Sequence, residues 1–106
     1  MIIDCVSDMH GSFPELEGGD LLILAGDHTS NDTIPAWKAF YDWFRAQKYR
    51  KKIMIAGNHD NHLQYHISDE MYDKEFKQFF DDEERFYDYL CDSGTEFEGL
   101  KLWGSP

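Results

Sequence analysis

Three short apolar runs divide the first half of the chain and predict β-strands. They are "IIDCVS" (2–7), "LLILA" (21–25) and "IMIA" (53–56), and turn-forming residues bound each of them. The second and third runs are almost continuous in apolar residues, as expected of strands that are covered on both faces of a sheet. Asp4 interrupts the first run, so the strand pattern is weaker there.

A helix is predicted between the second and third runs, starting near Pro35, a residue favoured at the first helical position. Its apolar face consists of aromatic residues at helical spacing: Trp37, Phe40, Tyr41 and Phe44. A basic cluster follows: Lys48, Arg50, Lys51 and Lys52. We expect this cluster to end the helix, because cations there complement the negative end of the helix dipole. Strand, helix and strand in this order indicate a right-handed crossover in an α/β sheet.

Two further patterns occupy the last third of the chain. Residues 69–92 are acidic and aromatic together and predict a helix, whose apolar face consists of Tyr72, Phe76, Phe79 and Phe80. We expect the acidic residues to form its solvated side, with an acidic docking surface as the alternative. The stretch "TEFEGLKLWGS" (95–105) alternates and turns at Glu98-Gly99, which predicts a hairpin. Since no repeat, low-complexity tract or linker interrupts the chain, we expect one domain over residues 1–106.

Charge narrows the classes of partner. The chain has 106 residues, and ten basic against twenty-one acidic side chains give a formal charge of -11. Such a surface argues against binding to a nucleic-acid backbone, which depends on Lys and Arg to displace counterions, and against binding to anionic membranes. It suits a protein that collects metal cations, although solubility alone also explains negative charge.

The cysteines and the N-terminus bear on location. Cys5 and Cys91 form neither a disulfide framework nor a CxxC metal motif, so we expect free thiols in a reducing cytoplasm. The start "MIIDCVSD" has no basic region of the kind that opens a signal peptide. No stretch approaches the roughly 20 apolar residues of a membrane span. We therefore expect a cytoplasmic protein.

Polar residues follow each predicted strand. Asp8 and His10 follow the first in "SDMHG", Asp27 follows the second in "GDHTSND", and "GNHD" (57–60) follows the third. In an open α/β sheet, ligands bind beyond the carboxyl ends of the strands, so these side chains are expected to converge. Glycines at 11, 26 and 57 allow turns tight enough for the backbone to pass close to a ligand.

The residue types in this set favour metal binding. Asp, His and Asn without a thiolate suit divalent manganese, iron or zinc. A carboxylate can bridge two ions, and Asp27 follows the middle one of the three strands. Each residue alone has an ordinary explanation: Asp8 as a helix cap, Asp27 as a turn residue and Asn58 as an Asx-turn former. Together with His10 and His59, they favour the metal interpretation.

The ordered motifs D-x-H, GD and GNHD, each after a strand, resemble those of the calcineurin-like metallophosphoesterase family. The tail "YLCDSGTEFEGLKLWGSP" (89–106) is similar to the segment in which these enzymes form a hairpin and re-enter the fold, so the resemblance covers essentially the whole chain. It implies the N-terminal portion of a four-layer α/β sandwich, with a mixed β-sheet flanked by helices. We expect the domain over residues 1–106 to be truncated at its C-terminus.

The resemblance also implies a dinuclear centre of two divalent cations (manganese, iron or zinc). Asp8 and His10 would bind the first metal, Asp27 would bridge both, and Asn58 would bind the second metal and touch the phosphate. His59 would protonate the leaving oxygen. The implied activity is hydrolysis of a phosphomonoester or phosphodiester substrate, in which water activated by the metals attacks phosphorus in line.

Asp60 is assigned a supporting role by the same resemblance, in which it would hold the His59 imidazole in its useful orientation. The family often has Asp or Asn three positions after the bridging Asp, whereas this chain has Ser30 there. We expect that difference to loosen the surroundings of the site without removing a ligand.

The chain also lacks part of the family pattern. Family members carry a further His and a GHxH motif in a second half, and no GHxH occurs here. We therefore expect weak metal binding and little turnover from this chain alone. His28, His62 and His66 are candidates to replace the missing ligands, although loop or surface positions are the favoured interpretation.

Two alternatives to an independent enzyme remain open. The chain could be a catalytically inactive module that keeps the fold and docks a partner through its hairpin or acidic helix. Alternatively, another chain could supply the missing half of the site by assembly or swapping. The metal and the ester that is cleaved are not specified by the sequence, because Asp, His and Asn suit several cations.

Overall fold

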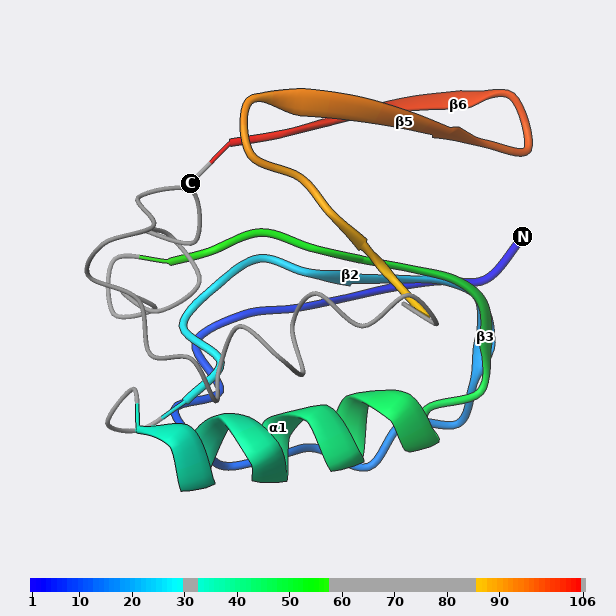
Figure 1. Cartoon of the computed structure of the whole chain (residues 1–106). Helices are drawn as coiled ribbons and strands as arrows, with labels where there is room; N and C mark the ends of the chain where they lie inside the picture. Colours follow the sequence, from blue (N-terminus) through cyan, green and yellow to red (C-terminus); the bar gives the residue numbers. More distant parts are fainter. Residues whose placement is uncertain (30–32, 58–85, 106) are drawn as a thin grey trace.

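The computed structural model describes residues 1–29, 33–57 and 86–105 (Figure 1). Within these ranges the elements are, in order, β1 (Ile3–Val6), β2 (Gly19–Leu24), α1 (Ile34–Ala46), β3 (Tyr49–Met54), β4 (Asp88–Tyr89), β5 (Ser93–Phe97) and β6 (Leu100–Gly104). The first four strands form a parallel sheet in the order β1-β2-β3-β4, and β5 pairs with β6 in an antiparallel hairpin. The predicted α/β class is confirmed, and a strand overlaps each of the three predicted N-terminal runs, although β3 covers 49–54 where the prediction is 53–56.

Strands β1, β2 and β3 end level with one another. In the parallel register Val6 lies beside Leu24, and Leu24 lies beside Met54. The pairing continues past the strand ends, since the Ala25 N–H donates to the Val6 carbonyl (2.8 Å) and the Ile55 N–H to the Leu24 carbonyl (3.0 Å). The segments that follow the three strands therefore leave the sheet at the same edge.

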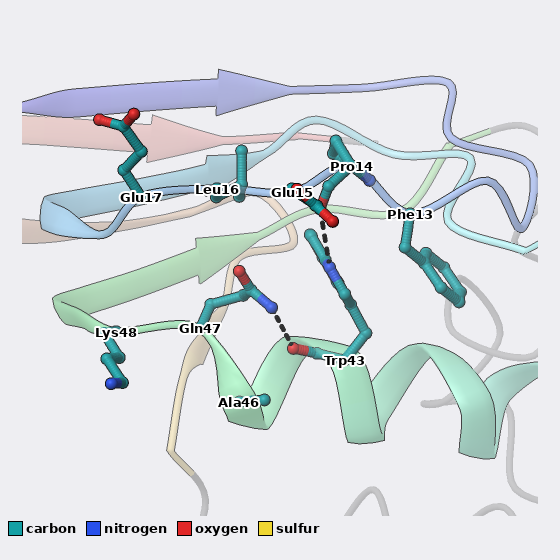
Figure 2. Close-up of a pocket in the computed structure, with 9 residues that line it drawn as sticks. All are labelled: Phe13, Pro14, Glu15, Leu16, Glu17, Trp43, Ala46, Gln47 and Lys48. Atoms are coloured by element: carbon teal, nitrogen blue, oxygen red, sulfur yellow. Dashed lines mark hydrogen bonds between the residues drawn. The ribbon is translucent and has the colours of Figure 1, made fainter.

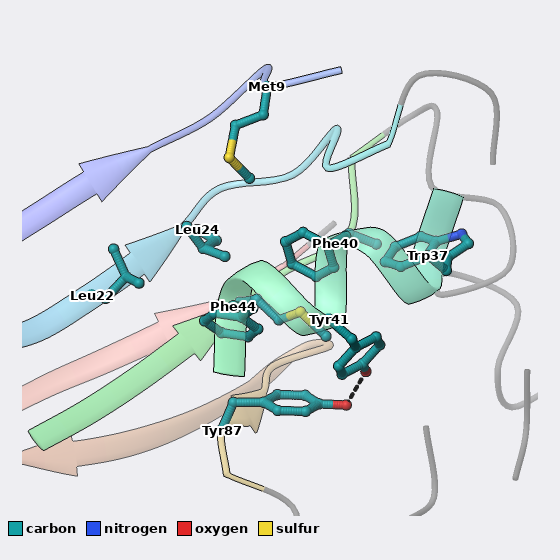
Figure 3. Packing of buried hydrophobic residues seen from close by; sticks show 10 residues of the cluster. Met9, Leu22, Leu24, Trp37, Phe40, Tyr41, Phe44 and Tyr87 are labelled. Carbon is teal, nitrogen blue, oxygen red and sulfur yellow. Dashed lines mark hydrogen bonds between the residues drawn. The ribbon is translucent and has the colours of Figure 1, made fainter. Parts of the chain in front are cut away.

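Helix α1 forms where its sequence signals predict. The Thr33 side chain caps its start by accepting from the Ala36 N–H (3.4 Å), and Pro35 lies in the first turn. The predicted aromatic face is buried in the core (Figure 3), and its members are Trp37, Phe40, Tyr41 and Phe44. The helix therefore presents its apolar side to the sheet.

Strands β2 and β3 are covered on both faces, as their continuous apolar runs predict, by α1 on one side and the hairpin on the other (Figure 1). On one face Leu22, Leu24 and Met54 pack against the aromatic side of α1 (Figure 3). On the other face Leu21 and Ile53 pack with apolar residues of the β5–β6 hairpin. Alternate residues of β2 thus enter separate apolar clusters.

Three residues of the basic cluster, Arg50, Lys51 and Lys52, lie in β3 and Lys48 directly precedes it, so the prediction that the cluster ends the helix is wrong. Helix α1 ends before Gln47, whose backbone is extended (φ -72°, ψ 136°), and β3 starts soon after. Lys52 still contacts the helix terminus, because its Nζ donates to the carbonyls of Phe44 (2.9 Å) and Arg45 (3.2 Å). The Phe44 carbonyl also accepts from the Gln47 N–H (3.2 Å), so the ammonium adds a donor to the carbonyls at the helix end, and it does so from a neighbouring strand.

The hairpin is confirmed, with Glu98 (φ 51°) and Gly99 (φ 81°) both left-handed in its turn. The helix predicted over residues 69–92 is wrong at its end, where β4 pairs with β3 and the Leu90 N–H donates to the Met54 carbonyl (3.0 Å). The open edge of β3 offers hydrogen bonds there that local helical spacing does not reveal. The rest of that prediction lies outside the described residues, including Tyr72, Phe76, Phe79 and Phe80.

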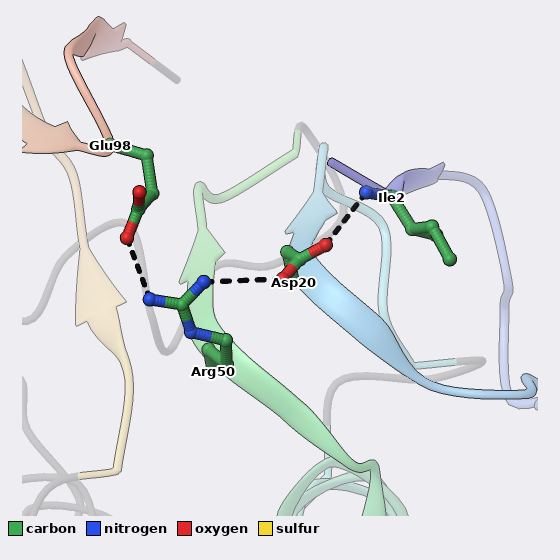
Figure 4. Close-up of polar contacts among 4 residues, drawn as sticks. All are labelled: Ile2, Asp20, Arg50 and Glu98. Carbon is green, nitrogen blue, oxygen red and sulfur yellow. Dashed lines mark hydrogen bonds and ion pairs between the residues drawn. The ribbon is translucent and has the colours of Figure 1, made fainter.

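An ion-pair network joins the hairpin to the sheet (Figure 4). The Arg50 guanidinium contacts Asp20 Oδ1 (3.3 Å) and Glu98 Oε1 (2.6 Å), and Asp20 Oδ2 accepts from the Ile2 N–H (2.8 Å). That backbone hydrogen bond, and then Arg50, lower the pKa of Asp20. The turn of the hairpin is therefore tied to the starts of β2 and β3.

The connection between β1 and β2 is anchored on α1 (Figure 2). Phe13 stacks on Trp43 with ring centroids 5.4 Å apart, and the Trp43 indole N–H donates to the Pro14 carbonyl (3.0 Å). A cleft of about 510 Å³ lies beside these residues. Its lining includes none of the candidate metal ligands, so we assign it no part in the candidate centre.

Cys5 and Cys91 are free thiols, as predicted. Cys5 is exposed on β1, and Cys91 is partly buried after β4. In the described parts of the chain, no helix is long and apolar enough to cross a membrane.

Candidate metal centre

Asp8, His10 and Asp27 converge at the edge of the sheet where β1 and β2 end. One ligand atom from each lies within 4.8 Å of the others. Backbone hydrogen bonds hold the two segments together, because the Asp8 N–H donates to the Gly26 carbonyl and the His10 N–H to the Asp27 carbonyl, both at 3.1 Å. These three side chains therefore lie together, as predicted for residues that follow neighbouring parallel strands.

The backbone of all three residues is left-handed. Asp8, His10 and Asp27 have φ values of 56°, 48° and 57°. For a residue with a Cβ this region costs roughly 1–2 kcal/mol, and such strain gathers at functional sites. Only two other non-glycine residues in the described ranges share it, so the strain is concentrated at the candidate centre.

The cluster opens to solvent on one side. Asp8 and His10 are exposed, whereas Asp27 is only 8% exposed. His10 Nε2 lies 3.9 Å from Asp8 Oδ1, and the Ser7 hydroxyl donates to Asp8 Oδ2 (2.9 Å). A cation can thus approach from solvent and meet a buried carboxylate behind two exposed ligands.

Gly57, the first residue of the third motif, is in close contact with Gly26 and Asp27 of the second motif. A Cβ on Gly57 would lie 2.2 Å from Asp27 Oδ1, and a Cβ on Gly26 would lie 2.7 Å from the Gly57 Cα. Gly26 also has a φ of 103°, which a side chain would strain. Both glycines are therefore needed for the close approach that the sequence predicts, and the chain enters "NHD" (58–60) from beside Asp27.

The chain matches the calcineurin-like phosphoesterase family over residues 1–105. The chain belongs to this family. The resemblance carried by D-x-H, GD and GNHD is thereby confirmed, and the parallel sheet with its antiparallel pair is consistent with the N-terminal part of the metallophosphoesterase fold. At the level of the family, membership indicates metal-dependent hydrolysis of phosphoesters.

Several curated proteins are similar to this calcineurin-like phosphoesterase chain over 96% of its length. Metallophosphoesterase domain-containing protein 1 of Homo sapiens is 29% identical over 117 residues, which cover 36% of that protein. A UPF0046 protein of Caenorhabditis elegans is 31% identical over 113 residues, or 40% of its length. A probable rhamnogalacturonate lyase C of Emericella nidulans is 36% identical over 106 residues, which are 10% of that protein. The chain thus spans less than half the length of these relatives.

The residues present fit a divalent cation of the kind that the phosphoesterase family uses. Two carboxylates and an imidazole are ligands that manganese, iron and zinc accept. Ligand atoms about 2.1 Å from one cation lie within about 4.2 Å of each other. The observed limit of 4.8 Å therefore requires only small side-chain rotations.

The structure describes only the first residue of the third phosphoesterase motif, Gly57. Asn58, His59 and Asp60 lie outside the described residues, as do Ser30 and the histidines at 62 and 66. Their proposed roles stay predictions. What the structure describes is the approach to them, through Ile55, Ala56 and Gly57.

His28 lies in a loop, as predicted, but it is fully buried rather than on the surface. Its Nε2 is 2.8 Å from the Ile55 carbonyl, and its ring stacks on Phe40 with centroids 4.6 Å apart. It is not a member of the Asp8, His10 and Asp27 cluster. The sequence signal for its burial is the aromatic face of α1, which requires the tertiary arrangement to be recognised.

Proposed function

We propose that this chain supplies the N-terminal ligands of a metallophosphoesterase site that uses two divalent cations to hydrolyse phosphomonoesters or phosphodiesters. The observation that carries the proposal is the convergence of Asp8, His10 and Asp27 within 4.8 Å at the ends of neighbouring parallel strands. Family membership and the fitting donor set support it.

Each ligand has a role suited to its position. Asp8 and His10 hold the first cation, since both are exposed and follow the same strand. Asp27 follows β2, which lies between β1 and β3, and its carboxylate lies between the first motif and Gly57, so it is the carboxylate suited to bridge both cations. Asn58 provides a neutral oxygen to the second cation and contacts the phosphate.

His59 and Asp60 carry the proton chemistry in this proposal. His59 donates a proton to the leaving oxygen of the ester, and Asp60 accepts a hydrogen bond from the imidazole to fix its orientation. Divalent cations, when bound, polarise water and offset the negative charge of the phosphoryl group. That offset matters in a chain of formal charge -11, which otherwise repels a phosphoester.

Manganese titration of the 106-residue chain by calorimetry tests the metal site. Asp27→Asn keeps the side-chain shape but removes the buried charge, and we expect it to weaken manganese binding at least about tenfold. Asp42→Asn is the matched control, because Asp42 is an exposed carboxylate on α1. Its affinity should equal that of the unsubstituted chain. Absence of binding heat in the unsubstituted chain would reject the metal site and favour the inactive binding module.

Hydrolysis of an aryl phosphate monoester and an aryl phosphate diester, each with manganese, tests the reaction. The chain spans only part of its relatives, so the assay is run on this chain and on any longer product of the same gene. His59→Ala and Asp27→Asn should each remove most of the turnover that is observed. Full activity in both variants would refute the assigned roles, and a measured mass above that of one chain would indicate assembly.

A further inference from the structure

A histidine beside the candidate centre is buried where an apolar ring would pack equally well. His28 directly follows Asp27 and is fully buried. Its ring lies on Phe40 at an interplanar angle of 19° and meets Trp37 edge-on at 6.0 Å. Phenylalanine would fill such an aromatic pocket without desolvating two ring nitrogens. The polar atoms of His28 therefore call for a reason beyond packing.

The hydrogen bond of His28 supplies that reason. Its Nε2 is 2.8 Å from the Ile55 carbonyl, so the protonated nitrogen donates to a residue just beyond the end of β3. In the segment after β2, the backbone leaves the extended conformation at Gly26, whose φ is 103°. The His28 side chain thus links the segment after β2 to the segment after β3. This link lies close to the turn at Gly26.

The main chain of His28 makes a second connection. Its carbonyl accepts from the Gly11 N–H (3.3 Å), and Gly11 directly follows His10. One residue therefore contacts the segment of the first motif through its backbone and the segment leading to the third motif through its imidazole. It is also covalently attached to the second motif at Asp27.

The tolerance for movement between these segments is small. Asp27 Oδ1 lies so close to Gly57 that a single added methyl group would overlap it at 2.2 Å. A shift of a few tenths of an ångström between the two segments therefore changes where the Asp27 carboxylate points relative to Asp8 and His10. Metal ligands depend on outer hydrogen bonds of this kind for their orientation.

We infer that His28 is a positioning residue, which holds the segments of all three motifs in register by donating to the Ile55 carbonyl, and that it is not a metal ligand. This inference rests on the proposed metal site. It removes His28 from the candidates to replace a missing ligand, a role that the sequence leaves as the less favoured interpretation. It also explains why the second motif carries a polar ring inside an aromatic core.

Two substitutions separate the hydrogen bond from the packing. His28→Phe keeps an aromatic ring in the pocket and removes the donor, whereas His28→Gln keeps a donor at a similar reach. We expect His28→Phe to weaken manganese binding about tenfold to a hundredfold, measured by calorimetry on the 106-residue chain, and His28→Gln to remain within about threefold. Leu22→Ala is the control for stability, since it truncates a buried residue in the middle of β2.

Each outcome decides between the ideas. Leu22→Ala should lower the thermal midpoint while leaving manganese affinity unchanged, and equal losses of affinity in Leu22→Ala and His28→Phe would show a merely structural effect. Unchanged affinity in His28→Phe would overturn the inference while the metal proposal stands. Absence of binding in the unsubstituted chain would overturn both. A second readout needs no metal: His28→Phe should speed hydrogen exchange at the Gly11 amide at least about tenfold relative to His28→Gln, because the segments are no longer held together.

Discussion

At the scale of single residues, left-handed backbone conformations and one glycine shape the candidate centre. Asp8, His10 and Asp27 depart from ordinary strand geometry just where β1 and β2 end. Backbone hydrogen bonds from Asp8 and His10 to Gly26 and Asp27 support those conformations and bring the three side chains together. Gly57 then leaves the space that the Asp27 carboxylate occupies.

Gly57→Ala tests this local arrangement. The added Cβ would lie 2.2 Å from Asp27 Oδ1 and must displace the carboxylate or the backbone, so we expect a loss of about 1–3 kcal/mol in unfolding free energy and weaker manganese binding. Urea unfolding and calorimetry measure the two effects. Gly94→Ala in the hairpin is the control, because its Cβ would meet the Leu102 carbonyl at 3.1 Å, far from the metal ligands in sequence. Unaltered manganese affinity in Gly57→Ala would contradict the proposed contact.

Tyr49 provides a prediction about pH. Burial, followed by the hydrogen bond that its hydroxyl donates to Asp4, raises the pKa of Tyr49 to about 12. An unfolded tyrosine ionises near its usual value of about 10, so the unfolded state releases this proton first. The contribution of Tyr49 to stability is therefore complete below pH 10 and is lost as pH rises toward 12. Urea unfolding should show a steeper loss over that range in the unsubstituted chain than in Tyr49→Phe; equal slopes would contradict it.

At the scale of elements, α1 is joined to β3 by a lysine that is almost fully buried. Lys52 is 7% exposed, and burial lowers its pKa. Its ammonium also lies over the Phe86 ring, 5.1 Å from the centroid. The cost of burying the charge is offset by the two helix carbonyls that accept from it.

Lys52→Met removes the ammonium while keeping a long apolar stem. It removes this donor from the Arg45 carbonyl and leaves the Phe44 carbonyl with the Gln47 N–H alone, so we expect a loss of about 1–3 kcal/mol in unfolding free energy. Lys51→Met is the matched control on the same strand, because Lys51 pairs with Asp88 nearer the surface and such pairs contribute less than about 1 kcal/mol. Denaturant unfolding compares the two variants. Equal losses of unfolding free energy in the two variants would show that the hydrogen bonds from Lys52 to the helix carbonyls do not account for its contribution to stability.

Strand β3 shows which part of a strand can be predicted from the sequence and which part cannot. Strand β2 and the end of β3 are recognisable because burial on both faces leaves a continuous apolar run. The basic start of β3 is not, since Arg50 and Lys51 are accommodated by acidic residues distant in sequence. Local spacing carries no record of such contacts, and the helix dipole offered a simpler explanation.

For the molecule as a whole, the candidate site is more predictable than the edges of the fold. Asp8, His10 and Asp27 could be placed together from strand order alone, because parallel strands deliver their following residues to one edge. The burial of His28 could not, since it depends on a helix that packs beneath the loop. The short strand β4 was missed because its pairing partner is supplied by β3.

Binding of manganese at the proposed site and general screening of the acidic surface predict different effects on thermal stability. A cation that binds only the folded chain stabilises it by about 1.4 kcal/mol when its free concentration is ten times the dissociation constant, or about 5–10 °C in thermal midpoint for a domain of this size. Screening of a formal charge of -11 would instead raise stability with any salt.

We expect manganese to raise the thermal midpoint more than sodium chloride of equal ionic strength does. Chelation of the manganese should reverse the increase, and a variant with both Asp8→Asn and Asp27→Asn should lose it. Asp42→Asn changes one exposed charge on α1 and should keep the full increase. If the double variant gained as much as the unsubstituted chain, the cations would be binding the acidic surface rather than the converging side chains.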